Sequence, residues 1–116
     1  MISIGTAGPN SIQMSKGDYF IRSIRLTQNG EPYCLAEDEE AVFTVRRQPN
    51  ESHRVLLQKS YSEQGADVFP LEITLSDVED IPVGRYVYDI RLKKIDVDGF
   101  ITPMRPMLFE LWEVVG

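Results

Sequence analysis

The stretch IPVGRYVYDIRLKKI, residues 81–95, decides how the rest of the chain folds. Within it, apolar residues recur at every second position: Tyr86, Tyr88, Ile90 and Leu92. Charged residues fill all but one of the positions between them, and a period of two puts the two sets on opposite faces of a β-strand. Helical spacing would scatter the charges around the cylinder. We therefore predict a central strand of an antiparallel sheet with one face buried and one face in water.

The composition limits the classes of partner that the protein can be expected to bind. The chain has 116 residues, enough for one domain with a single core, and 42% of them are hydrophobic. Its formal net charge of −6 leaves no basic stripe for phosphate, so we expect neither nucleic acid nor anionic membranes as partners. No apolar run approaches the roughly 18 residues that a membrane span requires, so we expect no membrane insertion.

The number of cysteines and the N-terminal sequence indicate the cellular compartment in which the protein is made. Cys34 is the only cysteine, which excludes an intrachain disulfide, and it is most simply a small buried hydrophobe. The first residues, MISIGTAGPNSIQM, lack the positive region and the continuous apolar region of a signal peptide. We expect the protein to be cytoplasmic when it is made, and to leave the cytoplasm only within a larger assembly.

Alternating segments separated by turn residues predict the other strands. They are residues 19–28, 41–47, 54–61, 71–75 and 100–115, the last as one strand or a pair, with a weaker short strand at 10–14. Ser76 or Asp77 is predicted to cap a single helical turn after residue 75. About seven strands at these spacings suit a two-sheet antiparallel β-sandwich over residues 16–116, preceded by a leader over residues 1–15.

The shared period also predicts which side chains fill the core of this sandwich. They are Phe43, Val45, Leu71, Ile73, Leu75, Tyr86, Tyr88, Ile90 and Leu92. The acidic run at residues 37–40 is interpreted as a solvated loop. Pro103 and Pro106 cannot donate to a ladder, so the chain before the last strand must be an edge, a bulge or a bend.

One local pattern refines the sandwich to an immunoglobulin-like one. The segment from Asp80 to Tyr86 resembles the tyrosine corner of such domains, in which a tyrosine hydroxyl bonds back to upstream backbone. Gly84 and the Asp98-Gly99 turn, at the two ends of the central strand, are assigned structural roles. The cysteine pair of antibody domains is absent, so we predict an all-β, immunoglobulin-like antiparallel sandwich without the antibody signature.

Few residues suggest a catalytic or metal-binding role. His53 is the only histidine and has no obvious helper, which favours an ordinary loop residue over a catalytic triad. Asp80, Asp96 and Asp98 are weak candidates for calcium, but a hairpin turn favours the same residues and the distal glutamate of a calcium loop is missing. We therefore predict no catalytic site, no cofactor and no metal site.

The order of turns and strands resembles that of a known protein family. The matching segments are Lys16-Gly17-Asp18, Asn29-Gly30-Glu31-Pro32, residues 41–46, 55–59, 71–75 and 83–90, and Asp98-Gly99 followed by Thr102-Pro103. From about Lys16 onward, the chain resembles the N-terminal domain of phage baseplate upper proteins and related small phage or prophage tail proteins. It departs from that family at residues 104–107, which replace a small turn before the last strand.

The resemblance implies a non-enzymatic structural component of a phage or prophage tail or baseplate, placed in the virion. Such a protein acts through protein–protein contacts with other tail proteins or with copies of itself. The alternative is a surface or carbohydrate-binding immunoglobulin-like module, which should carry a secretion signal and exposed aromatic platforms. An enzyme ranks third because no nucleophile or acid–base pair is assembled in the sequence.

The last strand supplies the candidate interface. If Met107, Phe109 and Leu111 point into the core, alternation turns Leu108, Trp112 and Val114 outward. Tryptophan is enriched at interface hot spots, so we predict that these three residues form a docking surface. The competing interpretation is a bulge near Pro106 that shifts the register and lets Trp112 cap the core.

Overall fold

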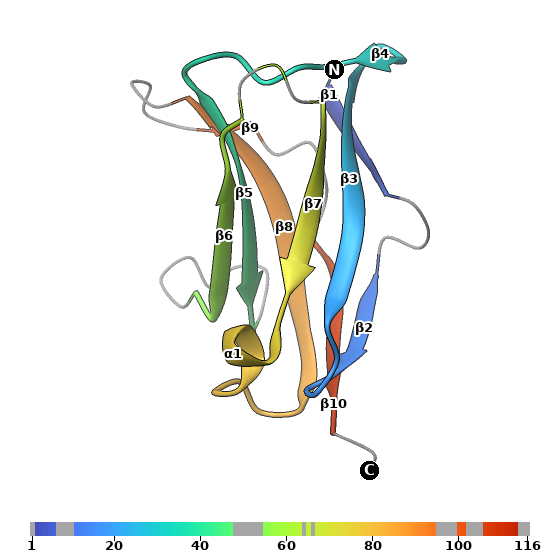
Figure 1. Cartoon of the computed structure of the whole chain (residues 1–116), viewed down its shortest axis with the longest axis vertical. Coiled ribbons are helices and arrows are strands. Elements are labelled where there is room, and N and C mark those ends of the chain that lie inside the picture. Colours follow the sequence, from blue (N-terminus) through green and yellow to red (C-terminus); the bar gives the residue numbers. More distant parts are fainter. Residues whose placement is uncertain are drawn as a thin grey trace.

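The predicted central stretch forms β8 (Gly84–Lys94), which lies between β5 (Glu39–Arg46) and β10 (Met107–Trp112) in one sheet (Figure 1). This computed structural model describes residues 2–6, 11–47, 55–63, 65, 67–94, 100–101 and 106–113. All four alternating apolar residues of β8, Tyr86, Tyr88, Ile90 and Leu92, are buried. The predicted central strand is therefore confirmed.

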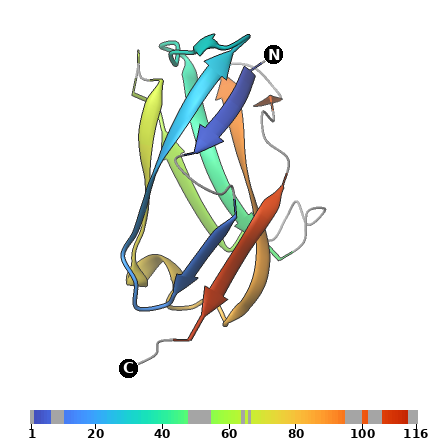
Figure 2. The ribbon, with the colours of Figure 1, turned by 90° about the vertical axis from the view of Figure 1, so that its right-hand side faces the viewer.

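The described strands form two sheets that pack face to face (Figure 1, Figure 2). The first runs β2–β10–β8–β5–β6 with β9 beside β8, and in the second β3 pairs with β1, β4 and β7. The remaining strands are β1 (Ile2–Thr6), β2 (Ile12–Ser15), β3 (Phe20–Gln28), β4 (Glu31–Pro32), β6 (Leu57–Tyr61), β7 (Val68–Ile73) and β9 (Phe100–Ile101). Every described pair is antiparallel except β2 with β10, which is parallel.

This strand order is that of an immunoglobulin-like sandwich. Strands β1, β3 and β7 stand where such domains place strands A, B and E. Strands β5, β8 and β10 correspond to C, F and G, and β6 to the additional strand beside C of variable-type domains. The predicted fold class is confirmed, although the one parallel pair departs from a wholly antiparallel sandwich.

The structure of the N-terminal residues differs from the predicted boundary between a leader and the sandwich. Residues 2–6 were expected in a leader, but they form β1 and pair with β3, and residues 12–15 then form β2 in the other sheet. The chain thus crosses from one sheet to the other within its first strands (Figure 2). The described part contains ten strands rather than seven, because β1 and the two-residue strands β4 and β9 add to the predicted ones, and β2 is the short strand predicted at residues 10–14.

Leu75 is the one predicted core residue that lies outside the core. It is 50% exposed and begins α1 (Leu75–Val78), the single helical turn that the sequence predicts (Figure 1). The N-cap is Thr74 rather than Ser76 or Asp77, and the Thr74 backbone N–H donates to Asp77 Oδ2 at 2.8 Å. This reciprocal capping ends the strand at Ile73, so the alternation stops before Leu75.

Asp77 also ties the helical turn to an edge strand. Lys59 Nζ on β6 lies 2.8 Å from Asp77 Oδ2. Partial burial alone would raise the pKa of Asp77, but the hydrogen bonds from Lys59 and Thr74 outweigh it and the pKa is lowered. An inward-pointing lysine on an edge strand is one way in which natural sheets avoid edge-to-edge pairing.

The start of β5 corrects half of the interpretation of residues 37–40 as a solvated loop: residues 37–38 are exposed in a turn, but residues 39–40 belong to the strand. Glu39 is 3% exposed, and its Oε1 accepts hydrogen bonds from the Tyr33 hydroxyl at 2.6 Å and from the Ala36 backbone N–H at 2.9 Å. Burial, together with the hydrogen bond to Glu39, raises the pKa of Tyr33 to about 12. A buried carboxylate is tolerated here because its oxygens are hydrogen-bonded.

An aromatic pair packs in the core at the six-stranded sheet's central pairing, β8 with β5. Tyr88 follows the corner tyrosine by two residues, the position of the second antibody cysteine, and its ring packs 5.2 Å from that of Phe43 on β5. Both side chains are buried. Cys34, expected to be buried, is exposed in the connection between β4 and β5 and takes no part in this core.

The tyrosine corner is present as predicted. Tyr86 is buried, and its hydroxyl donates a hydrogen bond to the backbone carbonyl of Pro82. This bond spans the turn that leads from α1 into β8. Gly84 enters the strand with φ at 156°, a backbone conformation that residues with a Cβ rarely adopt.

Replacing Tyr86 by Phe keeps the ring and removes only the corner hydrogen bond. We expect the free energy of unfolding to fall by about 0.5–1.5 kcal/mol, as measured by urea denaturation. Tyr19→Phe is the control, because Tyr19 is 62% exposed and its change should leave the unfolding midpoint in place. An unchanged midpoint for Tyr86→Phe would show that the corner bond does not stabilise the fold.

Candidate functional site on the outer face of the six-stranded sheet

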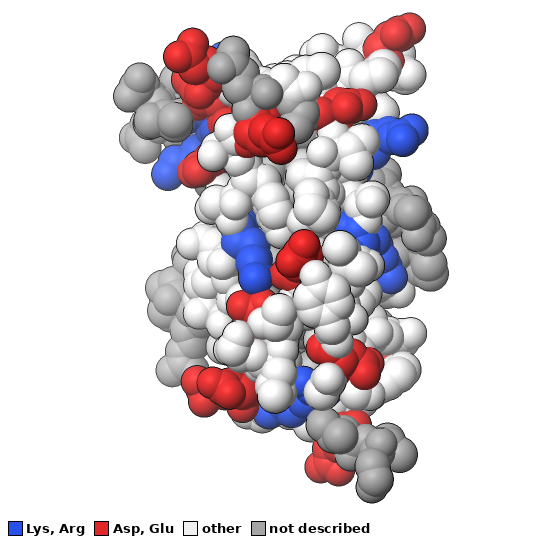
Figure 3. All heavy atoms as spheres, viewed as in Figure 1, with Lys and Arg blue, Asp and Glu red and all other residues white. Residues whose placement is uncertain are grey.

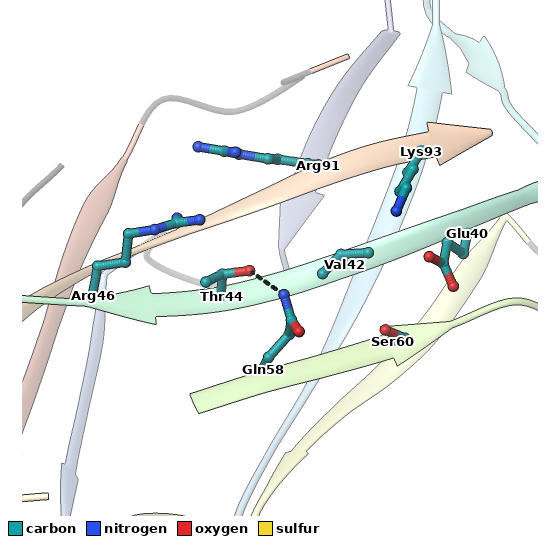
Figure 4. A pocket seen from close by; sticks show the side chains of 8 residues that line it. All are labelled: Glu40, Val42, Thr44, Arg46, Gln58, Ser60, Arg91 and Lys93. Atoms are coloured by element: carbon teal, nitrogen blue, oxygen red, sulfur yellow. Dashed lines mark hydrogen bonds between the residues drawn. The ribbon is translucent and has the colours of Figure 1, made fainter. Parts of the chain in front are cut away.

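The outward-pointing side chains of the six-stranded sheet form two adjacent regions. The first, named the β10 patch, consists of Leu108 and Trp112 on β10 with the polar residues Gln13, Arg85 and Glu110 beside them. The second is a shallow groove of about 200 Å³ over β5, β6 and β8 (Figure 4). Both regions follow from strand alternation, since the opposite face of each strand fills the core.

The register of β10 places Trp112 at the surface. Phe109 and Leu111 are fully buried, Leu108 is half-buried, and Trp112 is 47% exposed. Trp112 therefore does not cap the core, and its backbone carbonyl accepts a hydrogen bond from the Lys16 N–H at 3.0 Å. Its position at the end of β10, close to where β2 ends, is fixed by this bond and by the parallel pairing of the two strands (Figure 2).

Polar side chains next to Trp112 are tied to one another. Glu110, which lies between Leu108 and Trp112, accepts hydrogen bonds from Arg85 Nε at 3.0 Å and from Gln13 Nε2 at 3.1 Å. The hydrogen bond from Arg85 is the main cause that lowers the pKa of Glu110. The carboxylate that interrupts the apolar positions is thus ionised and paired, which leaves Trp112 as the prominent exposed apolar group of the patch.

The groove owes its shape to strand register. Val42 lies directly between Arg91 on β8 and Ser60 on β6, and Thr44 lies between Asp89 and Gln58. The short side chains of Val42, Thr44 and Ser60 form a low floor, and the longer side chains on either side form the walls (Figure 4). Gln58 Nε2 donates to Thr44 Oγ1 at 3.5 Å across the floor.

A buried ion cluster closes one end of the groove. Arg46 Nη1 and Arg91 Nη2 lie 3.3 and 3.2 Å from the same oxygen, Oδ2 of Asp89. The Asp89 side chain is 6% exposed and that of Arg46 is 8% exposed. Asp89 was expected on the water-facing side of β8; it is instead buried, and its carboxylate is paired with both arginines.

Several predicted site residues lie outside the described residues: Val114 of the candidate interface, the calcium candidates Asp96 and Asp98, the turn residue Gly99, and His53. The third calcium candidate, Asp80, is exposed in the turn after α1. Within the described ranges, no group of three or more His, Cys, Asp and Glu side chains could hold a metal ion. In the same part of the chain, no helix is long and apolar enough to cross a membrane.

The groove was missed by sequence reasoning. Alternation does put Thr44 and Arg46 on the outer face of β5, and Arg91 and Lys93 on the outer face of β8. Their convergence depends on the pairing of β5 with β8, which joins residues more than forty positions apart, as in the 43 that separate Arg46 from Asp89. The available signal was the cluster of outward-facing cations at residues 91 and 93.

The other broad side of the molecule has a different charge pattern. On the face seen in Figure 3, where β3 and β7 lie nearest to the viewer, basic and acidic side chains are mixed among uncharged ones. Neither positive nor negative charge dominates among the described residues of that face. The groove, with three cations among its eight lining residues, differs from that mixed surface.

Comparisons with known proteins give a distant structural likeness. A scan against protein-family models finds none that matches the chain. A search of curated proteins finds no match. Among solved structures, the chain is similar to that of murine CRIg, with 10% sequence identity, a TM-score of 0.47, and coverage of 99% of each chain.

Proposed function

We propose that this protein is a non-enzymatic structural component of a phage or prophage tail or baseplate that acts through protein–protein contacts. The order of its turns and strands from Lys16 onward, which resembles baseplate upper proteins, is the basis for the tail assignment. The exposed Trp112 at the end of β10 is the observation that carries the proposed mode of action. On this proposal, the protein is made in the cytoplasm and becomes part of the virion.

The β10 patch has the features of an interface anchor. A half-exposed tryptophan offers a large apolar surface that a partner can cover, and tryptophan is among the residues most enriched at hot spots. The hydrogen-bonded group of Glu110, Arg85 and Gln13 beside it would form a polar rim whose partners are already satisfied. Docking on this patch would therefore bury apolar surface without stranding a charge.

The edges of the six-stranded sheet set the geometry of docking. Strand β2 pairs only with β10 among the described strands, so the patch lies next to an edge of the sheet. A partner, either another tail protein or a second copy of this chain, could cover Trp112 and continue over β2. The parallel pairing of β2 with β10 holds both strands in place before the partner arrives, which limits the entropy lost on binding.

Replacing Trp112 by Ala tests this function. We expect the association constant, measured by sedimentation velocity of the protein alone and with co-expressed tail proteins, to fall by about thirtyfold or more, as for a hot-spot residue. The fold should persist because the side chain is already 47% exposed. Tyr19→Ala, which removes an exposed aromatic ring from the other sheet, is the matched control and should leave association unchanged.

Two outcomes would contradict the proposal. One is a Trp112→Ala protein that associates like the wild type. The other is a wild-type protein that stays monomeric at high concentration and binds none of the tail proteins produced with it.

A further inference from the structure

We propose that the groove over β5, β6 and β8 is a docking site for the carboxylate of an aspartate or glutamate in an extended segment of a partner protein. The inference rests on the groove itself and holds whether or not the protein belongs to a phage tail. The groove lies beside the β10 patch on the same sheet, so one partner could reach both.

Charge is the first reason for this assignment. Three cations line the groove, Arg46, Arg91 and Lys93. One carboxylate, Glu40, lines it with them, and a second, the buried Asp89, is paired with both arginines. Three positive and two negative charges leave a local surplus of one positive charge. The whole chain carries 18 acidic and 12 basic residues, so this surplus runs against its overall charge.

The hydrogen-bonding state of Arg46 is the second reason. Its side chain is 8% exposed and one of its terminal nitrogens binds Asp89 Oδ2, yet among the described residues its Nε has no hydrogen-bond partner, and neither has the second carboxylate oxygen of Asp89, Oδ1. Buried N–H groups are rarely left without an acceptor. Arginine offers its donors in a planar fork that matches a carboxylate, so an incoming carboxylate supplies the acceptor that this guanidinium lacks.

The shape of the groove identifies the carrier of the carboxylate. The floor of Val42, Thr44 and Ser60 is low and open. Arg46 and Arg91 reach toward each other at one end of it, and Lys93 points toward it further along β8 (Figure 4). A surplus of a single charge suits one carboxylate, whereas a nucleic acid would meet a protein of net charge −6. The exposed Gln58 and Ser60 on the edge strand β6 can hydrogen-bond the backbone of an extended segment.

Titration followed by ¹⁵N NMR of the whole chain tests the assignment with a defined probe. The probe is a capped Gly-Glu-Gly peptide, and the matched control peptide is Gly-Gln-Gly, which has the same shape without the charge. We expect saturable shifts of the backbone amides of residues 42–46, 58–60 and 89–93 and of the Arg46 Nε–H with the Glu peptide, and none with the Gln peptide.

Variants then locate the binding energy. Lys93→Gln should weaken binding of the Glu peptide by about two- to fivefold, as expected for an exposed charge. Arg91→Gln should weaken it by about tenfold or more, as expected for a charge-assisted hydrogen bond. Arg25→Gln removes one exposed cation from the opposite sheet and should leave binding unchanged. Lys93 is exposed, so its variant remains informative even if Arg91→Gln disturbs the fold.

Three results would overturn the inference. The Glu peptide could produce no saturable shift, or Arg25→Gln could weaken binding as much as the groove variants do. Inorganic phosphate could also bind the groove more tightly than the Glu peptide, which would assign the site to a different anion.

Discussion

Asp89→Ala should lower the free energy of unfolding by about 3–5 kcal/mol, because it leaves the charge of Arg46 buried without a partner. The carboxylate now receives two guanidinium groups on one oxygen, at 3.3 and 3.2 Å. Without it, Arg46 and Arg91 would face each other with no negative charge between them. The loss is measured by urea denaturation followed by circular dichroism.

Glu110→Ala is the matched control for this prediction. It also removes a carboxylate from the outer face of the same sheet, but its partner Arg85 has a side chain that is 80% exposed. We expect that change to leave the free energy of unfolding nearly unchanged, as for surface ion pairs. If Asp89→Ala costs no more than Glu110→Ala, the arginines are solvated and the buried ion cluster has no structural role.

Ile90→Ala should cost about 2–5 kcal/mol, because it opens a cavity in the centre of the core. Ile90 is 1% exposed and stands directly opposite Phe43 in the pairing of β8 with β5. Ile21→Ala is the control, since Ile21 is 55% exposed on the other sheet and should lose less than about 0.5 kcal/mol. Equal losses for the two variants would mean that β8 does not present Ile90 to the core.

Alternation in the sequence was sufficient to predict the inner faces of the strands. Eight of the nine residues predicted for the core are buried, and the corner bond of Tyr86 was predicted from seven consecutive residues. Both are local features, because a period of two assigns every second side chain to the same face whatever strand lies beside it. The exposure of Trp112 followed from the same rule once Phe109 and Leu111 were buried.

Other features depended on long-range pairing or on competing local bonds. Residues 2–6 have the composition of a leader and form a strand because β3 offers them an edge. Leu75 left the strand because Thr74 and Asp77 form a capping box, a stronger local signal than one more alternating leucine. The predicted burial of Cys34 rested on residue type alone, which does not determine where a connecting segment runs.

The groove shows where sequence reasoning reached its limit. Apart from Glu40, the groove residues on β5 and β8 were on the expected face, yet a groove requires the short side chains of Val42 and Ser60 to be adjacent across two strands. That adjacency is set by the register of β5 with β6. The sequence of the segment that joins the two strands does not reveal this register. The burial of Asp89 has the same origin, since its partner Arg46 comes from a different strand.

Fluorescence of Trp112 tests the central claim most directly, because it is the only tryptophan in the chain. The account predicts that the folded, unassociated protein shows red-shifted emission that acrylamide quenches readily. On association, whether with a tail protein or with a second copy, the emission should shift to the blue and quenching should fall. Association that leaves both the emission and the quenching of Trp112 unchanged would contradict the claim that the β10 patch is the docking surface.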